Sequence, residues 1–187
     1  MYGLVNQAIE ELVCSKYGDE AWEEVKRKAN TDVGDFVRME SYPDSITYGI
    51  VGAACEHLAI APETLLEHIG IYWVNFTGAK GYAEFLEAAG SDLFETLTNL
   101  DDMHTRVAMV YPKLAPPSFQ CERISDDEII LHYRSHRDGL AHMVIGLVKG
   151  LAGHFGTDVE ISRLLKKEDG ATHDTFAIKI TSQANGI

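Results

Sequence analysis

A change of hydrophobic period near the middle of the chain constrains its fold more than any other feature. Before Pro112, apolar residues recur at three- and four-residue steps, as on one face of an α-helix. After Pro117 they alternate with polar residues, as in strands buried on one side. The prolines between these parts mark a boundary, because proline has no N–H to continue either element. The sequence therefore predicts an α+β fold, with a helical N-terminal lobe followed by a sheet lobe.

Apolar stripes and the residues that interrupt them give the expected elements. The predicted helices run from Leu4 towards Gly18 and over Ala21–Ala29, Ser45–Ala59, Pro62–Phe76, Tyr82–Ala88 and Leu140–Phe155. The predicted strands are Phe119–Ile124, Glu128–Tyr133, Val159–Leu165 and Thr175–Ile180. We expect about four antiparallel strands with one long helix beside them. Residues 1–182 are expected to form one domain, with a helical lobe of about 1–111, a sheet lobe of about 117–182, and a disordered tail at 183–187.

The composition limits the partners and the compartment. The formal net charge of the 187 residues is −13, and such a chain repels phosphate backbones, so we expect no nucleic-acid partner. The best apolar run, Met143–Leu151, is too short for a membrane span and contains Lys149. Without a basic, apolar leader at its start, the protein is predicted to be cytoplasmic, with no membrane partner. No CxxCH motif is present, so a haem would not be attached covalently by the c-type route.

One histidine lies on an apolar stripe. His104 continues the helical series that begins at Leu93 and ends near Tyr111. Taken alone, a buried histidine satisfied by one hydrogen bond is the more common explanation. An axial haem ligand is the other, and it requires a neutral imidazole with Nε2 on iron and Nδ1–H held by a carbonyl or water. The residue by itself leaves both interpretations open.

A second candidate group closes the strand that ends at Tyr133. If the extended conformation persists, Tyr133, Ser135 and Arg137 point to the same side. A guanidinium fork and two hydroxyls suit a pair of carboxylates. An exposed polar strand end is the more ordinary explanation of this spacing alone. Together with a buried imidazole, however, a carboxylate clamp is what a non-covalently held haem needs.

Other polar residues give weaker signals. His132 and His136 have no third ligand in the pattern, so a zinc site is not predicted. His173 has no identifiable partner. Asp101 and Asp102 are adjacent on the predicted helix and are interpreted as surface charge.

Several motifs occur together in a familiar order. They are Met1–Asn6, Asn99–Val107 around His104, Pro116–Phe119, and Tyr133-x-Ser135-x-Arg137. From Met1 to about Ile180 the chain resembles the H-NOX family, the haem nitric oxide/oxygen binding domains, and is similar to the haem domain of the soluble guanylate cyclase β subunit. Each motif is short, but their order and spacing match the family's.

The resemblance implies a non-covalent haem b with ferrous iron, held between the two lobes of an H-NOX fold. It implies that His104 is the axial iron ligand and that Pro117 packs on the haem and distorts it. The YxSxR residues Tyr133, Ser135 and Arg137 would hold the propionates. The wall of the distal gas pocket would come from Val5, Trp73, Met143 and Leu147. Met143 stands where oxygen-binding members carry a tyrosine.

The function implied is a haem-based sensor of a diatomic gas, without catalysis of its own. Nitric oxide, and also carbon monoxide, would bind ferrous haem. Breakage of the iron–His104 bond would signal to a partner protein such as a histidine kinase or a cyclic-dinucleotide enzyme. Two alternatives stay open. A peroxidase-like enzyme would need a distal acid or base, for which His142 is the one candidate. A haem storage or transfer protein would need easy release, against which an Arg137 clamp works.

Overall fold

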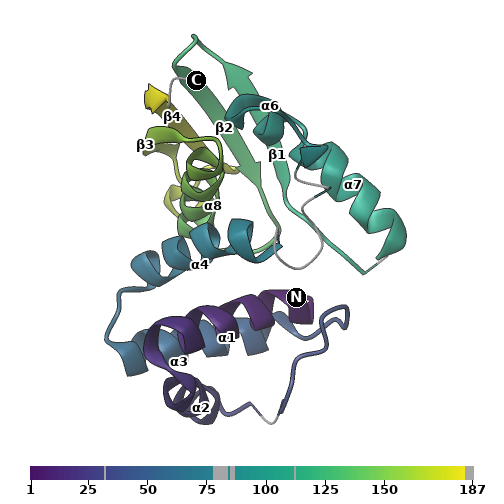
Figure 1. The fold of residues 1–187 in the computed structure, drawn as a ribbon, viewed down its shortest axis with the longest axis vertical. Helices are drawn as coiled ribbons and strands as arrows, with labels where there is room; N and C mark the ends of the chain where they lie inside the picture. Colours follow the sequence, from purple (N-terminus) through teal and green to yellow (C-terminus); the bar gives the residue numbers. More distant parts are fainter. Residues whose placement is uncertain (32, 78–83, 85–86, 112, 184–187) are drawn as a thin grey trace.

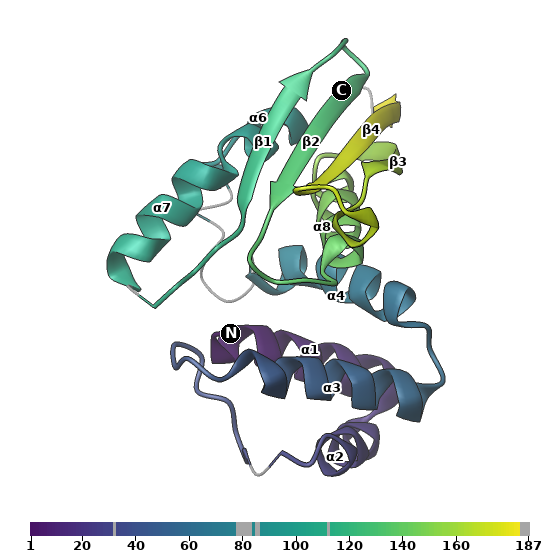
Figure 2. The same cartoon turned by 180° about the vertical axis from the view of Figure 1, so that it is seen from behind.

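The fold follows the change of period in the sequence. The computed structural model describes residues 1–187 except 32, 78–83, 85–86, 112 and 184–187. Three helices, α1 (Gly3–Tyr17), α2 (Asp19–Lys28) and α3 (Asp44–Leu58), pack together in the N-terminal lobe, and α4 (Pro62–Thr77) lies between them and the sheet lobe (Figures 1 and 2). The predicted helix Tyr82–Ala88 falls largely outside the described residues. Within the described part of the chain, no helix has both the length and the apolar character to cross a bilayer.

The second half forms one antiparallel sheet. Its strands are β1 (Ser118–Arg123), β2 (Glu128–Arg134), β3 (Thr157–Leu165) and β4 (Asp174–Gln183), in the order β1-β2-β4-β3. Helix α8 (Ala141–His154) packs on the sheet (Figure 1). The α+β prediction is thus confirmed. β4 extends past the predicted end at Ile180 because it pairs with β3 as far as Gln183, the partner of Thr157. The rest of the expected tail, 184–187, lies outside the described residues.

The segment around His104 forms two helices, whereas the sequence predicted one. Helix α6 (Leu93–Thr98) and helix α7 (Leu100–Val110) meet at Asn99. The Asn99 side chain donates to the carbonyl of Ala89 at 2.7 Å, which draws the chain out of a continuous helix. His104 therefore lies on a separate helix, α7, which packs beside β1 (Figure 1).

Two hydrophobic cores stabilise the two lobes. The N-terminal core is formed by buried side chains of α1, α2, α3 and α4, among them Ile9, Leu12, Ile50, Leu65 and Ile69. The core of the sheet lobe contains Leu97, Leu131, Val148, Phe176 and Ile178. Met143 packs against the first core and Leu147 against the second, one helical turn later on α8. This turn of α8 therefore lies at the seam between the lobes.

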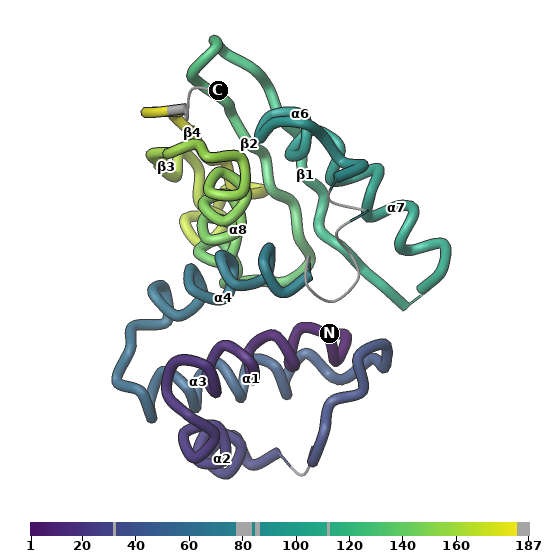
Figure 3. The backbone as a smooth tube through the Cα atoms, viewed as in Figure 1, coloured from purple at the N-terminus to yellow at the C-terminus, as the bar shows by residue number. Residues whose placement is uncertain are grey.

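Helices α4 and α8 cross in direct backbone contact, as the backbone tube shows (Figure 3). A Cβ atom on Gly70 would lie 2.2 Å from the carbonyl oxygen of Met143, and one on Gly146 would lie 2.1 Å from the carbonyl oxygen of Glu67. Only glycine permits such an approach without separating the helices. The contact places Met143 and Leu147 against α4, the helix that carries Trp73.

Candidate functional site

His104 presents a partly buried imidazole between α7 and β1. Its ring centroid lies 5.9 Å from that of Phe119, the second residue of β1. Burial lowers the pKa of the His104 imidazole, against smaller opposing effects of Asp101 and the backbone of Pro117. The ring is therefore neutral at neutral pH, and a neutral imidazole has the lone pair that a metal ion requires.

One nitrogen of this ring has no protein partner. Nδ1 of His104 is buried, and no described residue forms a hydrogen bond with it. The Pro117 backbone acts on the ring's pKa, and because proline has no N–H, the acting group is its carbonyl. That carbonyl is therefore a neighbour of the imidazole. Unpaired buried polar atoms are uncommon in folded proteins and often mark functional positions.

Asp101 fixes the start of α7 against the start of β1. Its carboxylate accepts hydrogen bonds from the Ser118 hydroxyl at 2.7 Å and from the Phe119 N–H at 2.6 Å. The interpretation of Asp101 as surface charge is therefore wrong. The side chain is half-buried, one helical turn before His104, and it sets the position of that turn relative to Pro117 and Phe119.

Tyr133 lies at the same end of the sheet. It pairs with Phe119 across β1 and β2, with ring centroids 5.4 Å apart, and its exposed fraction is 5%. Burial raises the pKa of the Tyr133 phenol, although the Ser135 side chain and Arg137 partly oppose this effect. The phenol therefore stays protonated and can donate a hydrogen bond.

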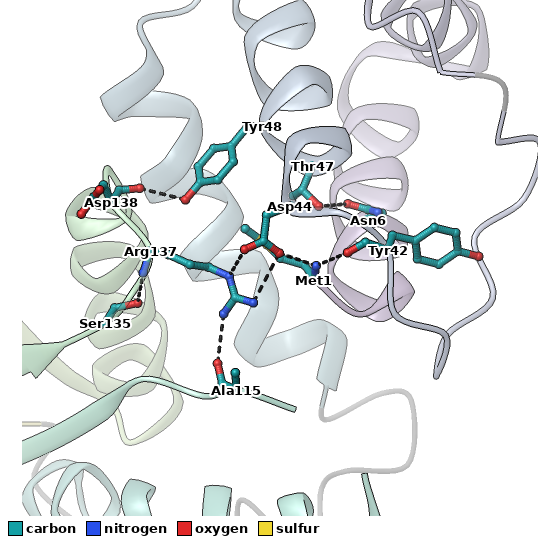
Figure 4. A network of polar contacts seen from close by, with 10 residues as sticks. All are labelled: Met1, Asn6, Tyr42, Asp44, Thr47, Tyr48, Ala115, Ser135, Arg137 and Asp138. Atoms are coloured by element: carbon teal, nitrogen blue, oxygen red, sulfur yellow. Dashed lines mark hydrogen bonds and ion pairs between the residues drawn. The ribbon is translucent and has the colours of Figure 1, made fainter. Parts of the chain in front are cut away.

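The strand alternation that placed Ser135 and Arg137 beside Tyr133 does not persist, because β2 ends at Arg134. The Ser135 hydroxyl accepts from the N–H of Arg137 at 3.0 Å, so the backbone turns here instead of continuing extended. Arg137 then reaches across to the N-terminal lobe, where it pairs with Asp44, and to the carbonyl of Ala115 (Figure 4). The three residues remain at one end of the sheet, brought there by a turn.

The residues expected on the distal side come from three helices. Val5 is on α1, Trp73 on α4, and Met143 and Leu147 on α8, and all four are partly buried. The Trp73 ring lies 6.2 Å from that of Phe76. Three of the four side chains are apolar, and only the Trp73 indole carries an N–H donor.

Three other histidines are engaged elsewhere. His132 Nδ1 lies 3.0 Å from Nε2 of His173 on the sheet, so His173 does have a partner that the sequence did not reveal. His142 Nδ1 lies 3.5 Å from a carboxylate oxygen of Glu67, which also pairs with Lys149. Among the described residues, no group of three or more histidine, cysteine or acidic side chains could hold a metal ion.

The site fits haem in its chemistry. It offers a neutral, partly buried imidazole, aromatic rings beside it, and a phenol and guanidinium that suit carboxylates. Fold and site together define a two-lobed cofactor-binding domain.

The chain belongs to the Haem-NO-binding family, the H-NOX domains: the family model matches residues 2–163. The expected family and fold are thereby confirmed. Soluble guanylate cyclase gcy-31 of Caenorhabditis elegans is 30% identical over 88% of this chain and 24% of its own length. Guanylate cyclase soluble subunit beta-2 of Rattus norvegicus is 37% identical over 57% of this chain and 16% of its own. The chain thus spans about a quarter or less of the length of these relatives.

Solved structures share the fold. An H-NOX protein from S. oneidensis in the Fe(II) state has a TM-score of 0.90 and 22% identity, covering 99% of this chain and 98% of its own. An H-NOX protein from S. oneidensis in the Fe(II)NO state has a TM-score of 0.88 and 22% identity, covering 97% of this chain and 100% of its own. Unliganded H-NOX from K. algicida gives 0.85 at 21% identity over the whole of both chains.

Proposed function

We propose that this chain is a haem-based sensor that binds nitric oxide and carbon monoxide and signals to a partner protein through release of the iron–His104 bond. The observation that carries the proposal is His104 itself, a neutral and partly buried imidazole where α7 meets β1, with its ring centroid 5.9 Å from that of Phe119. Tyr133, Ser135 and Arg137 would hold the propionates of a haem b, and Pro117 would pack on the ring. Val5, Trp73, Met143 and Leu147 would line the gas pocket.

When bound, haem would supply an iron centre, which His104 would hold and which could take up a diatomic gas. The protein's part is to position the imidazole and to convert its displacement into a change that a partner detects. Asp101 ties the first turn of α7 to β1, whereas Met109 and Val110 at its other end are 77% and 67% exposed. A change at His104 would therefore reach an exposed helix end, where a histidine kinase, a cyclic-dinucleotide enzyme or a cyclase segment could respond.

A peroxidase-like activity receives less support from the geometry. That chemistry needs an acid or base on the distal side. His142, next to Met143 in sequence, pairs with Glu67 of α4. We therefore propose a sensor without catalysis of its own.

The proposed contact between Arg137 and the haem propionates predicts a large change in haem retention when Arg137 is removed. Arg137→Ala should speed haem loss by roughly tenfold or more, because a charge-assisted hydrogen bond contributes about 1.5–3 kcal/mol. Arg137→Lys should restore retention only in part, because an ammonium lacks the planar fork. The measurement is the rate of haem transfer to excess apomyoglobin.

Arg134→Ala is the matched control for this series. Arg134 is exposed and donates to Gln120 at 2.6 Å, so its loss should leave the transfer rate unchanged. Equal rates in the wild type and Arg137→Ala would show that Arg137 does not hold the cofactor.

The proposed pocket also predicts ligand choice. Bound oxygen needs a distal hydrogen-bond donor to stabilise its negative outer atom, and Met143, Val5 and Leu147 offer none. The ferrous protein should bind nitric oxide and carbon monoxide but give no long-lived oxygen complex in air. Met143→Tyr should create measurable oxygen affinity. A stable oxygen complex in the unmutated protein would contradict this, and its loss in Trp73→Phe would identify the indole as the donor.

A further inference from the structure

Three hydrogen bonds fix the orientation of the Arg137 guanidinium. Nε donates to Oδ2 of Asp44 at 2.7 Å, Nη2 donates to Oδ1 of the same carboxylate at 3.3 Å, and Nη1 donates to the carbonyl of Ala115 at 3.0 Å (Figure 4). Asp44 is the first residue of α3, in the N-terminal lobe, and Ala115 lies in the segment that leads to Pro117 and β1. The guanidinium therefore joins both lobes.

These bonds leave two of the five guanidinium N–H groups for a further anion. Arginine has five N–H donors, and Asp44 takes the side formed by Nε and Nη2. With Ala115 on Nη1, one N–H remains on each terminal nitrogen as far as the described residues are concerned. Two such donors are the number that a bidentate carboxylate uses. Asp44 and Arg137 also line a surface hollow of about 490 Å³, together with Tyr48, His136 and Asp138.

The Asp44 carboxylate stays charged and can hold Arg137 across the neutral pH range. The Arg137 hydrogen bond lowers the pKa of the Asp44 carboxyl to about 2; burial opposes this effect, and the ammonium of Met1, which donates to Oδ1 at 2.5 Å, adds to it. The carboxylate is therefore ionised throughout the neutral range. One turn later on α3, the Tyr48 hydroxyl donates to the carbonyl of Asp138 at 2.9 Å. The N-terminal half of α3 thus contacts the Arg137 loop twice.

We propose that Asp44 is a positioning residue of the propionate site, which orients Arg137 towards the haem carboxylate and couples that contact to α3. The inference rests on the proposed function, since it takes Arg137 as the propionate contact. Asp44 could instead compete with a propionate for Arg137. This role fits the geometry less well, because Asp44 accepts from Nε and Nη2 and leaves one N–H on each terminal nitrogen able to donate. The N-terminal lobe would then be linked to the cofactor edge through a single carboxylate.

The test is a double-mutant cycle on haem loss from the reconstituted protein. Asp44→Asn should speed transfer to apomyoglobin by about fivefold to tenfold, as expected when a charged partner of a hydrogen bond is lost. In the Arg137→Ala background the same change should have no further effect, because the residue to be oriented is gone. Asp44→Glu keeps the carboxylate, so its rate of haem loss should lie between those of the wild type and Asp44→Asn. If Asp44→Asn does not fold, Asp44→Glu takes its place in the cycle.

Asp169→Asn is the control, since Asp169 lies away from the Arg137 loop and pairs with Lys166 through a side chain that is 70% exposed. It should leave haem loss unchanged. Resonance Raman gives a second readout: Asp44→Asn should shift the propionate bending band while the iron–histidine stretch stays in place.

Each result decides the matter. Unchanged or slower haem loss in Asp44→Asn, or an additive effect in the double variant, would overturn the positioning role while leaving the sensor proposal intact. Normal retention in Arg137→Ala would overturn both, because the clamp itself would then be absent.

Discussion

His104→Gly is expected to fold but to hold haem only when imidazole is supplied. The substitution removes the proposed iron ligand and leaves a cavity beside Phe119 that free imidazole fits. A glycine inside α7 costs about 1 kcal/mol, too little to unfold a domain of this size. The measurement is the visible spectrum of the reduced, purified variant with and without imidazole, and we expect near-complete loss of the haem band without it.

His136→Gly is the control for this substitution. His136 is exposed and follows β2 on the loop that carries Arg137, so its removal should leave haem content unchanged. An unaltered ferrous spectrum of His104→Gly in the absence of imidazole would show that another group ligates the iron.

Gly146→Ala is expected to lower the free energy of unfolding by about 3 kcal/mol, the upper part of the range for overpacked sites. The added methyl would lie 2.1 Å from the carbonyl oxygen of Glu67, so α4 and α8 must separate. Because backbone atoms are involved, a side-chain rotation cannot relieve the clash. Urea unfolding measures the change.

Gly153→Ala is the matched control on the same helix. No atom lies within 4 Å of the position its Cβ would take, and the residue is exposed. It should therefore be neutral or slightly stabilising, since alanine favours a helix over glycine. Equal stability of the two variants would contradict the close crossing of α4 and α8.

The sequence predicted the features that local periodicity encodes. The alternation in Glu128–Tyr133 predicted β2, and the stripe around Met143, Leu147 and Leu151 predicted α8, because both periods follow directly from backbone geometry. The apolar stripe also placed His104 on a buried face. The resemblance to the H-NOX family rested on short motifs whose order is linear, and it was confirmed.

The sequence could not predict contacts between distant segments. Arg137 and Asp44 are 93 positions apart, and nothing in either neighbourhood indicates the other. Asp101 looked like surface charge because its partners, Ser118 and Phe119, follow on β1. A signal did exist for Asp44: an acidic residue directly after a proline, at the start of a predicted helix, is typical of a helix N-terminus.

The end of β2 and the break at Asn99 were missed for a similar reason. Both depend on a single side chain that bonds to the backbone, Ser135 to Arg137 and Asn99 to Ala89. Serine and asparagine compete in this way with regular hydrogen-bond ladders, but their presence alone does not show where they do so.

The visible spectrum of the reduced, haem-loaded protein before and after nitric oxide tests the central proposal most directly. We predict a spectrum typical of histidine-ligated ferrous haem, which nitric oxide converts into that of a five-coordinate nitrosyl haem, with loss of the iron–histidine stretch in resonance Raman. Failure to take up haem, or a nitric oxide complex that keeps the bond to His104, would contradict the proposed sensor.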